Sequence, residues 1–266
     1  MHEPNAMRPA IDRRAFVASA LVGGMGALTG CSLLGSPTPL AVEPGGRLSV
    51  KHAPPTALAP SGLQPLGLST GRDATLYVPT DHKLSEPLPL MVLFHGAGGE
   101  AANWFGSYDD RGESARIIML AIDSRGYSWD VLFIGHGPDV AFVDDALAAT
   151  FDRCAVRADR ISCAGFSDGA TYSLAIGLTN GDLFSHVIAY SAGGLTGIDR
   201  HGAPRVFASH GVQDPILPVG VSQEYVPRLR AAGYDVSYHD FQGGHEVPPA
   251  ISSTAIAWLL QDYLLA

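Results

Sequence analysis

Two kinds of hydrophobic pattern alternate along the chain from residue 74 to the end. Continuous apolar runs, such as residues 88–96 and 116–123, are typical of strands that are buried on both faces of a sheet. In residues 139–154, apolar side chains instead recur every three or four positions, which predicts an amphipathic helix. The pattern predicts strands at 74–79, 88–96, 116–123, 160–167, 184–193, 204–211 and 234–241, and helices at 139–154, 168–181, 221–233 and 248–266.

This alternation predicts an α/β fold with a mostly parallel sheet of about eight strands, an antiparallel start and helices on both faces. Pro227 predicts an interruption of the helix 221–233. Residues 193–203 are all that separates two of the predicted strands, and a parallel crossover usually takes a dozen residues or more. An inserted cap domain does not fit there, so we expect an open cleft.

The first 45 residues have a different character. A basic start is followed by a short apolar stretch, 15–28, which is too short and too rich in glycine for a membrane span. Arg13-Arg14-Ala15-Phe16 resembles a twin-arginine export signal, and Leu28-Thr29-Gly30-Cys31 resembles a bacterial lipoprotein box.

We therefore predict an export signal at 1–30, lipidation of Cys31, a flexible tether at 31–45 and a folded domain at 46–266. The protein would be exported and lipid-anchored to a bacterial membrane, facing the periplasm or the outside. An N-terminal helix packed on the domain is the alternative.

Composition narrows the choice of partners. The formal net charge is −9, and no basic run exceeds Arg13-Arg14, which argues against a nucleic-acid partner. Hydrophobic residues make up 46% of the chain, enough for a sizeable core. An exported protein can keep disulfides, so Cys154 and Cys163 form either a bridge or two buried thiols. The sequence does not indicate an oligomeric state.

A serine between two glycines marks the centre of the chain. In "ISCAGFSDGAT", residues 161–171, Ser167 follows a predicted strand and precedes a predicted helix, with Gly165 and Gly169 two positions away on either side. A tight turn of this kind pushes the hydroxyl off the sheet, and small neighbours leave it accessible. A serine hydroxyl is a weak nucleophile unless a base accepts its proton, so this arrangement predicts a base nearby.

Asp214 and His245 follow two later strands. Because ligands of parallel sheets bind beyond the carboxyl ends of the strands, we expect both to meet Ser167. Asp240 competes with Asp214 for the acidic role. A zinc site is an alternative that the spacing does not support; its residues would be His210, Asp214, His239 and His245. We interpret His95 and His210 as structural residues that shape loops.

Four stretches carry a resemblance to a known family: "LFHGAGG" (93–99), "GFSDG" (165–169), "SHGVQDPILP" (209–218) and "GGHEVP" (243–248). The second resembles the nucleophile elbow of the α/β-hydrolase fold. Over about residues 46–266 the chain looks most like the small, capless carboxylesterase/phospholipase group of serine esterases, which is related to dienelactone hydrolases and polyhydroxyalkanoate depolymerases.

The resemblance implies roles for these residues. Ser167 would attack an ester carbonyl, His245 would transfer its proton, and Asp214 would orient His245. Backbone N–H groups of Ala97 and Asp168 would form the oxyanion hole. The Asp168 carboxylate would oppose that charge, so we expect it to turn away and accept N–H groups at the start of its helix. This chemistry needs no metal or cofactor.

The substrate is less defined. Aromatic residues in loops beside the predicted cleft either line a substrate pocket or pack under the loops; these are Trp104, Phe105, Tyr127 and Trp129. We expect hydrolysis of small, short- to medium-chain esters. A depolymerase of polyesters or other extended ester chains is the alternative, and a lipoprotein binding module that retains the fold is the non-enzymatic one.

Overall fold

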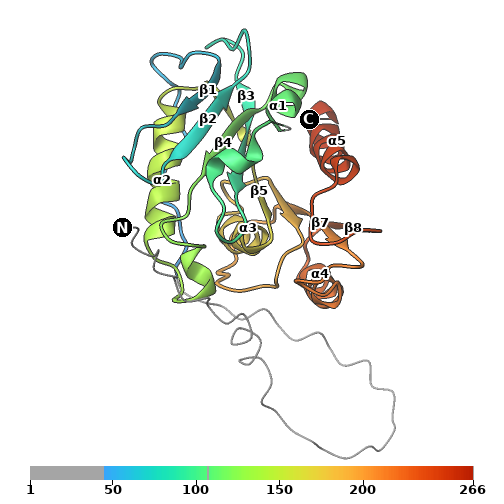
Figure 1. Cartoon of the computed structure of the whole chain (residues 1–266). Helices are drawn as coiled ribbons and strands as arrows, with labels where there is room; N and C mark the ends of the chain where they lie inside the picture. The colour runs from blue at the N-terminus through green and yellow to red at the C-terminus, as the bar shows by residue number, and fades with distance from the viewer. Residues whose placement is uncertain (1–44, 107, 266) are drawn as a thin grey trace, which may run out of the picture. The chain divides into compact units, whose positions relative to one another are not determined.

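A computed structural model describes residues 45–106 and 108–265. Eight strands form one sheet in the order β1-β2-β4-β3-β5-β6-β7-β8 (Figure 1). The strands are β1 (Gly62–Pro65), β2 (Ala74–Val78), β3 (Leu88–Phe94), β4 (Ile118–Ile122), β5 (Val156–Phe166), β6 (His186–Tyr190), β7 (Arg205–Gly211) and β8 (Val236–Phe241). The helices are η1 (Ala101–Trp104), α1 (Tyr108–Ala115), η2 (Asp130–Leu132), α2 (Pro138–Phe151), α3 (Asp168–Thr179), α4 (Gly220–Ala231) and α5 (Pro249–Leu265).

The expected α/β architecture is confirmed. β1 and β2 pair antiparallel, β2 pairs antiparallel with β4, and strands β3 to β8 pair in parallel. Because parallel strands end at one edge of the sheet, the loops that follow β3, β5, β7 and β8 gather there. Phe94 at the end of β3 is aligned with Gly165 in β5, which brings the two loops after these strands together.

Alternate side chains of the buried strands enter two separate cores. In β3, Leu90, Val92 and Phe94 belong to the core on the face of α2, α3 and α4. Met91 and Leu93 belong to the core on the face of α1 and α5. This is the side-chain alternation of a pleated strand, and it explains why β3 has a continuous apolar sequence: both of its faces are buried.

Two details differ from the expectations. α4 continues through Pro227 because Pro227 and Gln223, whose carbonyl loses its helical partner, are both exposed on the outer side of the helix. β1 and α1 were not predicted. β1 has only four residues, and α1 reads YDDRGESA, in which polar residues obscure a helical apolar pattern.

The connection between β6 and β7, residues 191–204, contains no helix, in keeping with the expected lack of space for a cap. Cys154 and Cys163 are buried free thiols, so the disulfide alternative is wrong. The predicted export signal, Cys31 and residues 31–44 of the tether lie outside the described residues. Among the residues that the structure describes, no helix has the length and hydrophobicity needed to cross a bilayer.

Candidate active site

Ser167 lies at a turn that only glycines can surround. It follows β5 and precedes α3, with φ 57° and ψ −121°, a left-handed conformation that is strained for serine. A Cβ on Gly165 would lie 2.0 Å from the Gly169 carbonyl oxygen, and a Cβ on Gly169 would lie 2.1 Å from the Phe94 carbonyl oxygen. Both contacts are with backbone atoms that cannot move aside. The two glycines therefore allow β3, β5 and α3 to approach closely enough to form the turn.

The structure brings Ser167, His245 and Asp214 into one hydrogen-bonded chain. His245 Nε2 is 2.8 Å from Ser167 Oγ, and His245 Nδ1 is 2.6 Å from Asp214 Oδ2. Because the ionised carboxylate can only accept, Nδ1 carries the imidazole proton and Nε2 presents its lone pair to the serine hydroxyl. The Phe166 ring packs on His245 with a centroid separation of 4.7 Å and supports this orientation.

Asp214 is held as a carboxylate by its own turn. Its Oδ1 accepts hydrogen bonds of 2.8 Å from the backbone N–H groups of Ile216 and Leu217. Burial opposes ionisation, but the hydrogen bonds from His245 and these two amides outweigh it and lower the Asp214 pKa below its ordinary value. Asp240, the competing acid, is exposed on β8.

His210 contacts the turn that follows Asp214. Its side chain is fully buried, its Nε2 donates to the Leu217 carbonyl at 2.7 Å, and Ser222 Oγ donates to its Nδ1 at 2.5 Å. Nε2 also lies 3.4 Å from Asp214 Oδ2. These contacts agree with the structural role expected for His210.

Two backbone N–H groups beside Ser167 are available to an oxyanion. Within residues 45–106 and 108–265, neither the Ala97 nor the Asp168 amide has a hydrogen-bond partner. The Asp168 carboxylate turns to Ser128, whose hydroxyl donates to it at 2.7 Å. The expectation that this carboxylate accepts N–H groups at the start of its own helix is therefore wrong. The N-terminus of α3 thus keeps its free N–H groups near the serine.

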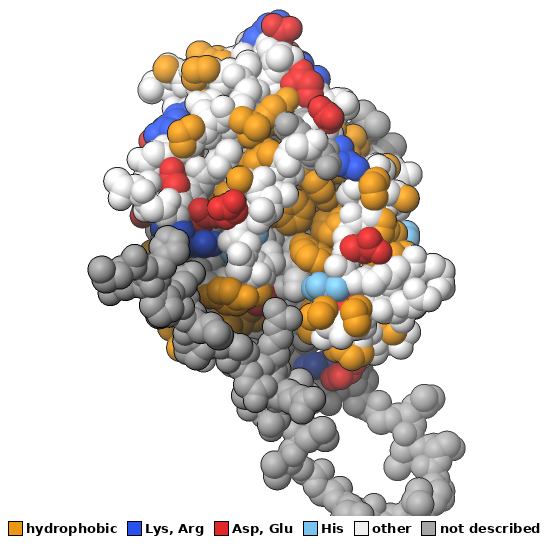
Figure 2. Space-filling view, viewed as in Figure 1, with side chains coloured by type: hydrophobic (Ala, Val, Ile, Leu, Met, Phe, Trp, Pro, Cys, Tyr) orange, Lys and Arg blue, Asp and Glu red, His pale blue; other side chains and the backbone are white. Residues whose placement is uncertain are grey.

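A cavity of about 440 Å³ adjoins these groups. Figure 2 shows hydrophobic side chains gathered in a hollow of the surface, with a histidine at its border. The cavity is lined on the reaction side by His245, Phe166, Gly96 and Ala97, and elsewhere mainly by Asn103, Trp104, Tyr108, Arg111, Glu246, Val247 and Ser252. Burial raises the pKa of Tyr108 to about 12, and its neutral hydroxyl donates to Tyr190 at 3.0 Å.

The four aromatic pocket candidates have different positions. Trp104 lines the cavity. Phe105 packs against the core on the α1 and α5 face, and Tyr127 is 75% exposed, with its ring against Gly98. For Trp129 the pocket expectation is wrong, because the indole is fully buried and stacks on Tyr172 at a centroid distance of 4.4 Å. A Trp in a loop at a strand end gave no sign in the sequence that it packs inward.

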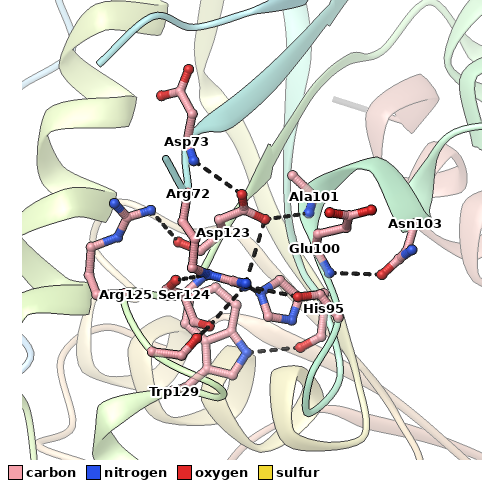
Figure 3. A network of polar contacts seen from close by, with 12 residues as sticks. Arg72, Asp73, His95, Glu100, Ala101, Asn103, Asp123, Ser124, Arg125 and Trp129 are labelled. Carbon is pink, nitrogen blue, oxygen red and sulfur yellow. Dashed lines mark hydrogen bonds and ion pairs between the residues drawn. The ribbon is translucent and has the colours of Figure 1, made fainter. Parts of the chain in front are cut away.

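Sequence reasoning missed a charged network (Figure 3) that contacts the segment after β3, residues 95–101, which we call the Ala97 loop. Arg72, just before β2, contacts His95, Gly99 and Ser124, and Asp123 at the end of β4 accepts a hydrogen bond from Ala101 N–H. His95 is structural, as expected: it bonds to the Gly96 carbonyl through Nδ1 at 2.7 Å. The sequence held one sign of this network, since Asp123 directly follows a buried strand.

The zinc alternative has no support in the described part of the chain. Those residues contain no group of three or more His, Cys, Asp or Glu side chains that could hold a metal ion. His239 stacks on the Phe207 ring at 4.8 Å and hydrogen-bonds to Ser237 instead.

Known proteins resemble the chain in both sequence and fold. A family model described as phospholipase/carboxylesterase matches residues 140–259, which include Ser167 and Asp214 as well as His245. The probable feruloyl esterase C of Aspergillus niger is 28% identical over 170 residues, covering 60% of this chain and 61% of that protein. Feruloyl esterase C of Emericella nidulans is 29% identical over 160 residues, covering 56% of this chain and 57% of that protein. The chain therefore spans about three fifths of the length of these curated relatives.

Solved structures extend the likeness over most of the domain. FphF, the fluorophosphonate-binding serine hydrolase F of Staphylococcus aureus, superposes with a TM-score of 0.61 at 14% identity, over 76% of this chain and 99% of that one. The Bacillus cereus carboxylesterase superposes with a TM-score of 0.56 at 17% identity, over 73% of this chain and 95% of that one. The chain has the α/β-hydrolase fold, and its sequence similarity to esterases supports carboxylic ester hydrolysis.

Proposed function

We propose that the chain is a serine hydrolase that cleaves carboxylic esters through Ser167, His245 and Asp214. The observation that carries the proposal is the continuous chain of hydrogen bonds from Asp214 through His245 to Ser167, at a strained turn beside two unpaired backbone amides. The family match and the esterase relatives support the same reaction.

In the first half of the reaction, the Ser167 hydroxyl attacks the ester carbonyl while His245 Nε2 takes its proton. Asp214 holds Nδ1–H and stabilises the imidazolium that forms. The N–H groups of Ala97 and Asp168 stabilise the oxyanion of the tetrahedral intermediate. Its collapse breaks the bond to the alcohol, which leaves with the proton from His245, and the acyl group remains on Ser167.

In the second half, a water molecule takes the place of the alcohol. His245 removes a proton from the water, which attacks the acyl carbonyl. The intermediate collapses to release the carboxylic acid, and His245 returns the proton to Ser167. No redox or metal step is involved.

The substrate we favour is a small, soluble ester with a compact acyl group. The cavity of about 440 Å³ beside His245 matches that size, and residues 191–204 between β6 and β7, where a cap could be inserted, contain no helix. Aromatic acyl esters are the second candidate, because Trp104, Tyr108 and Phe166 line the cavity and two relatives are named feruloyl esterases. Polyesters remain the extended alternative.

One substrate panel tests the reaction and its residues. The full chain is assayed on p-nitrophenyl esters of rising acyl length, on methyl ferulate and on a polyester film. We expect turnover of the short esters, and a fluorophosphonate probe should label Ser167. Ser167→Ala and His245→Ala should abolish labelling, and Asp214→Asn should lower kcat by about 10³- to 10⁴-fold.

Asp240→Asn is the matched control, because Asp240 lies near the end of β8, the strand that precedes His245, but is exposed. Its kcat should stay within about twofold of that of the unchanged chain, as for most surface substitutions. A folded, unlabelled wild-type chain without turnover would favour the binding module. Faster release of acid from the film than from any soluble ester would favour the depolymerase.

We also propose that the protein is exported and anchored through a lipid on Cys31. The support is the order of the motifs at 13–16 and 28–31 in the sequence. Cys31→Ala should move the protein from the membrane fraction to the soluble fraction, because the lipid is the proposed anchor. Retention of Cys31→Ala in the membrane fraction would refute the lipid attachment.

A further inference from the structure

One guanidinium joins the loops that follow two different strands. Arg72 Nε donates to the Ser124 carbonyl at 2.5 Å, and its Nη2 donates to the Gly99 carbonyl at 2.8 Å and lies 2.9 Å from His95 Nε2. Gly99 belongs to the loop after β3. Ser124, which Figure 3 labels, belongs to the loop after β4. Arg72 itself precedes β2, so it reaches both loops from a third segment.

Asp123 fixes the far end of the same loop. Its Oδ1 accepts the Ala101 N–H at 2.6 Å, its Oδ2 accepts the Asp73 N–H at 3.1 Å, and it pairs with Arg72 at 3.8 Å. Its side chain is 15% exposed, so water screens these interactions little. The loop after β3 is therefore tied at Gly99 and again at Ala101.

His95 transmits the constraint to the start of the loop. Its Nδ1 must carry the proton, because the partner at 2.7 Å is the Gly96 carbonyl. Its Nε2 then accepts from Ser124 N–H at 3.0 Å and from Arg72. Burial lowers the pKa of His95, which keeps the ring neutral and this pattern intact.

Two further N–H groups of the loop, on either side of its bend, are paired within or beside it. Gly98 N–H donates to the Tyr127 carbonyl at 2.8 Å, and Gly99 N–H donates to the Gly96 carbonyl at 3.0 Å. Gly98 has φ 67°, a conformation that suits glycine. Between these bonds, the Ala97 N–H is left without a partner among the described residues. The network thus determines the direction of this amide.

We propose that Arg72 is a positioning residue that holds the Ala97 N–H in the orientation needed to stabilise the oxyanion. This inference rests on the proposed ester hydrolysis. Oxyanion donors act by being oriented before charge develops, and losing one outright costs about 10²- to 10³-fold in kcat. Arg72 acts through the loop, so its loss should lower kcat by about 10- to 100-fold and leave KM within about twofold.

Lysine cannot replace it. The three acceptors lie in different directions, and the planar guanidinium meets them with donors at fixed angles, whereas an ammonium group is a single point on a flexible stem. Arg72→Lys should therefore share the defect in kcat although it keeps the charge.

The test compares Arg72→Ala and Arg72→Lys with Arg157→Ala, in the full chain. Arg157 is the matched control: its side chain is also 36% exposed and paired with an aspartate, but it lies at the start of β5, away from the carboxyl end where Ser167 sits. With a soluble p-nitrophenyl ester, both Arg72 variants should lose kcat, and Arg157→Ala should not. Added methylguanidinium should restore part of the lost kcat in Arg72→Ala and none of it in Arg72→Lys.

Amide hydrogen exchange gives a readout that does not depend on activity. Residues 96–101 should exchange faster in both Arg72 variants than in Arg157→Ala, while β5 and α3 keep their protection. If the unchanged chain hydrolyses esters and both Arg72 variants keep its kcat, the positioning role is wrong but the proposed function stands. Loss of kcat with no change in exchange at 96–101 would also overturn the positioning role. A wild-type chain that neither hydrolyses esters nor labels at Ser167 would overturn the proposed function and this inference together.

Should Arg72→Ala not fold, Asp123→Asn provides the second measurement. It removes the ion pair with Arg72 but keeps an oxygen for the Ala101 N–H. It should speed amide hydrogen exchange at 96–101 and lower kcat, as Arg72→Lys does, but by a smaller factor. No change in either quantity would also refute the role of the network.

Discussion

The turn at Ser167 and the loop of Ala97 lie at the same candidate active site but are held by different means. The Ser167 turn is defined by backbone contacts between residues that are close in sequence or in adjacent strands, above all those of Gly165 and Gly169. The Ala97 loop is held by side chains from distant segments, Arg72 and Asp123. One region is shaped by steric exclusion, and the other by hydrogen bonds.

This difference decides how each region responds to change. A Cβ added at Gly165 or Gly169 would lie about 2 Å from a backbone carbonyl oxygen, so a single added carbon disrupts the whole turn. A hydrogen-bonded loop can lose one bond and stay folded, but its amide then samples other directions. Substitutions at the turn should therefore act on stability and activity together, whereas substitutions at the loop should separate the two.

The largest effect is expected for Gly169→Ala. The new Cβ would lie 2.1 Å from the Phe94 carbonyl oxygen and 2.4 Å from the His95 carbonyl oxygen. We expect the free energy of unfolding to fall by about 3 kcal/mol or more, and labelling of Ser167 by a fluorophosphonate to disappear. Urea unfolding and the labelling assay measure the two quantities.

Gly220→Ala is the matched control for that substitution. A Cβ at Gly220 meets no atom within 4 Å, and the residue begins α4, where alanine is the better helix former. Its free energy of unfolding should stay constant or rise by up to about 1 kcal/mol. If Gly169→Ala behaved like Gly220→Ala, the steric account of the turn would be wrong.

Trp129→Ala should lower the free energy of unfolding by a comparable amount, and it acts on the loop side. The indole is fully buried, contacts Phe94 edge to face, stacks on Tyr172 and donates to the His95 carbonyl at 2.8 Å. Removing it should cost about 3–5 kcal/mol of unfolding free energy, as for other large aromatic side chains in cores. KM should change no more than kcat, because the indole does not line the cavity.

Tyr127→Ala offers the comparison within the same loop. Tyr127 is 75% exposed, so its loss should change the free energy of unfolding by no more than about 0.5 kcal/mol. A Trp129→Ala protein of normal stability with a raised KM would place the indole in the substrate pocket after all.

The same contrast explains what could be predicted from the sequence. The turn at Ser167 was predictable because its steric requirement appears as glycines at fixed positions around one serine. Asp214 and His245 were predictable because strand ends in a parallel sheet share one edge, although His245 depends on a loop whose geometry the sequence does not give.

The network of the Ala97 loop was not predictable in the same way. Arg72 is 23 residues before His95 and 52 before Ser124, with no recurring pattern between them, and a single arginine before a strand is usually a solvated surface residue. The sequence left open whether Trp129 lines the pocket or packs inward for a related reason: the loop after β4 turns inward because Asp139 accepts hydrogen bonds from the Arg125 and Asp130 amides, which are tertiary contacts. Hydrogen bonds between polar groups that are distant in the sequence determine the conformation of such loops.

The smallest effect, close to none, is expected from a reducing agent. Cys163 lies in β5, directly before the Ser167 turn, and its thiol is 3.6 Å from the Ser173 carbonyl, while Cys154 follows α2. Burial raises the pKa of the Cys154 thiol to about 12 and also raises the pKa of the Cys163 thiol. Both thiols therefore remain protonated and unreactive at neutral pH. In a Cys31→Ser chain, a thiol reagent should modify neither Cys154 nor Cys163 in the folded protein, and it should modify both after unfolding. Dithiothreitol should shift Tm by less than about 1 °C, because packing of buried thiols, and no covalent bridge, supports this side of the site. A Tm lowered by several degrees would show that a disulfide contributes, and the account of the Ser167 turn as one held by close backbone packing would have to include it.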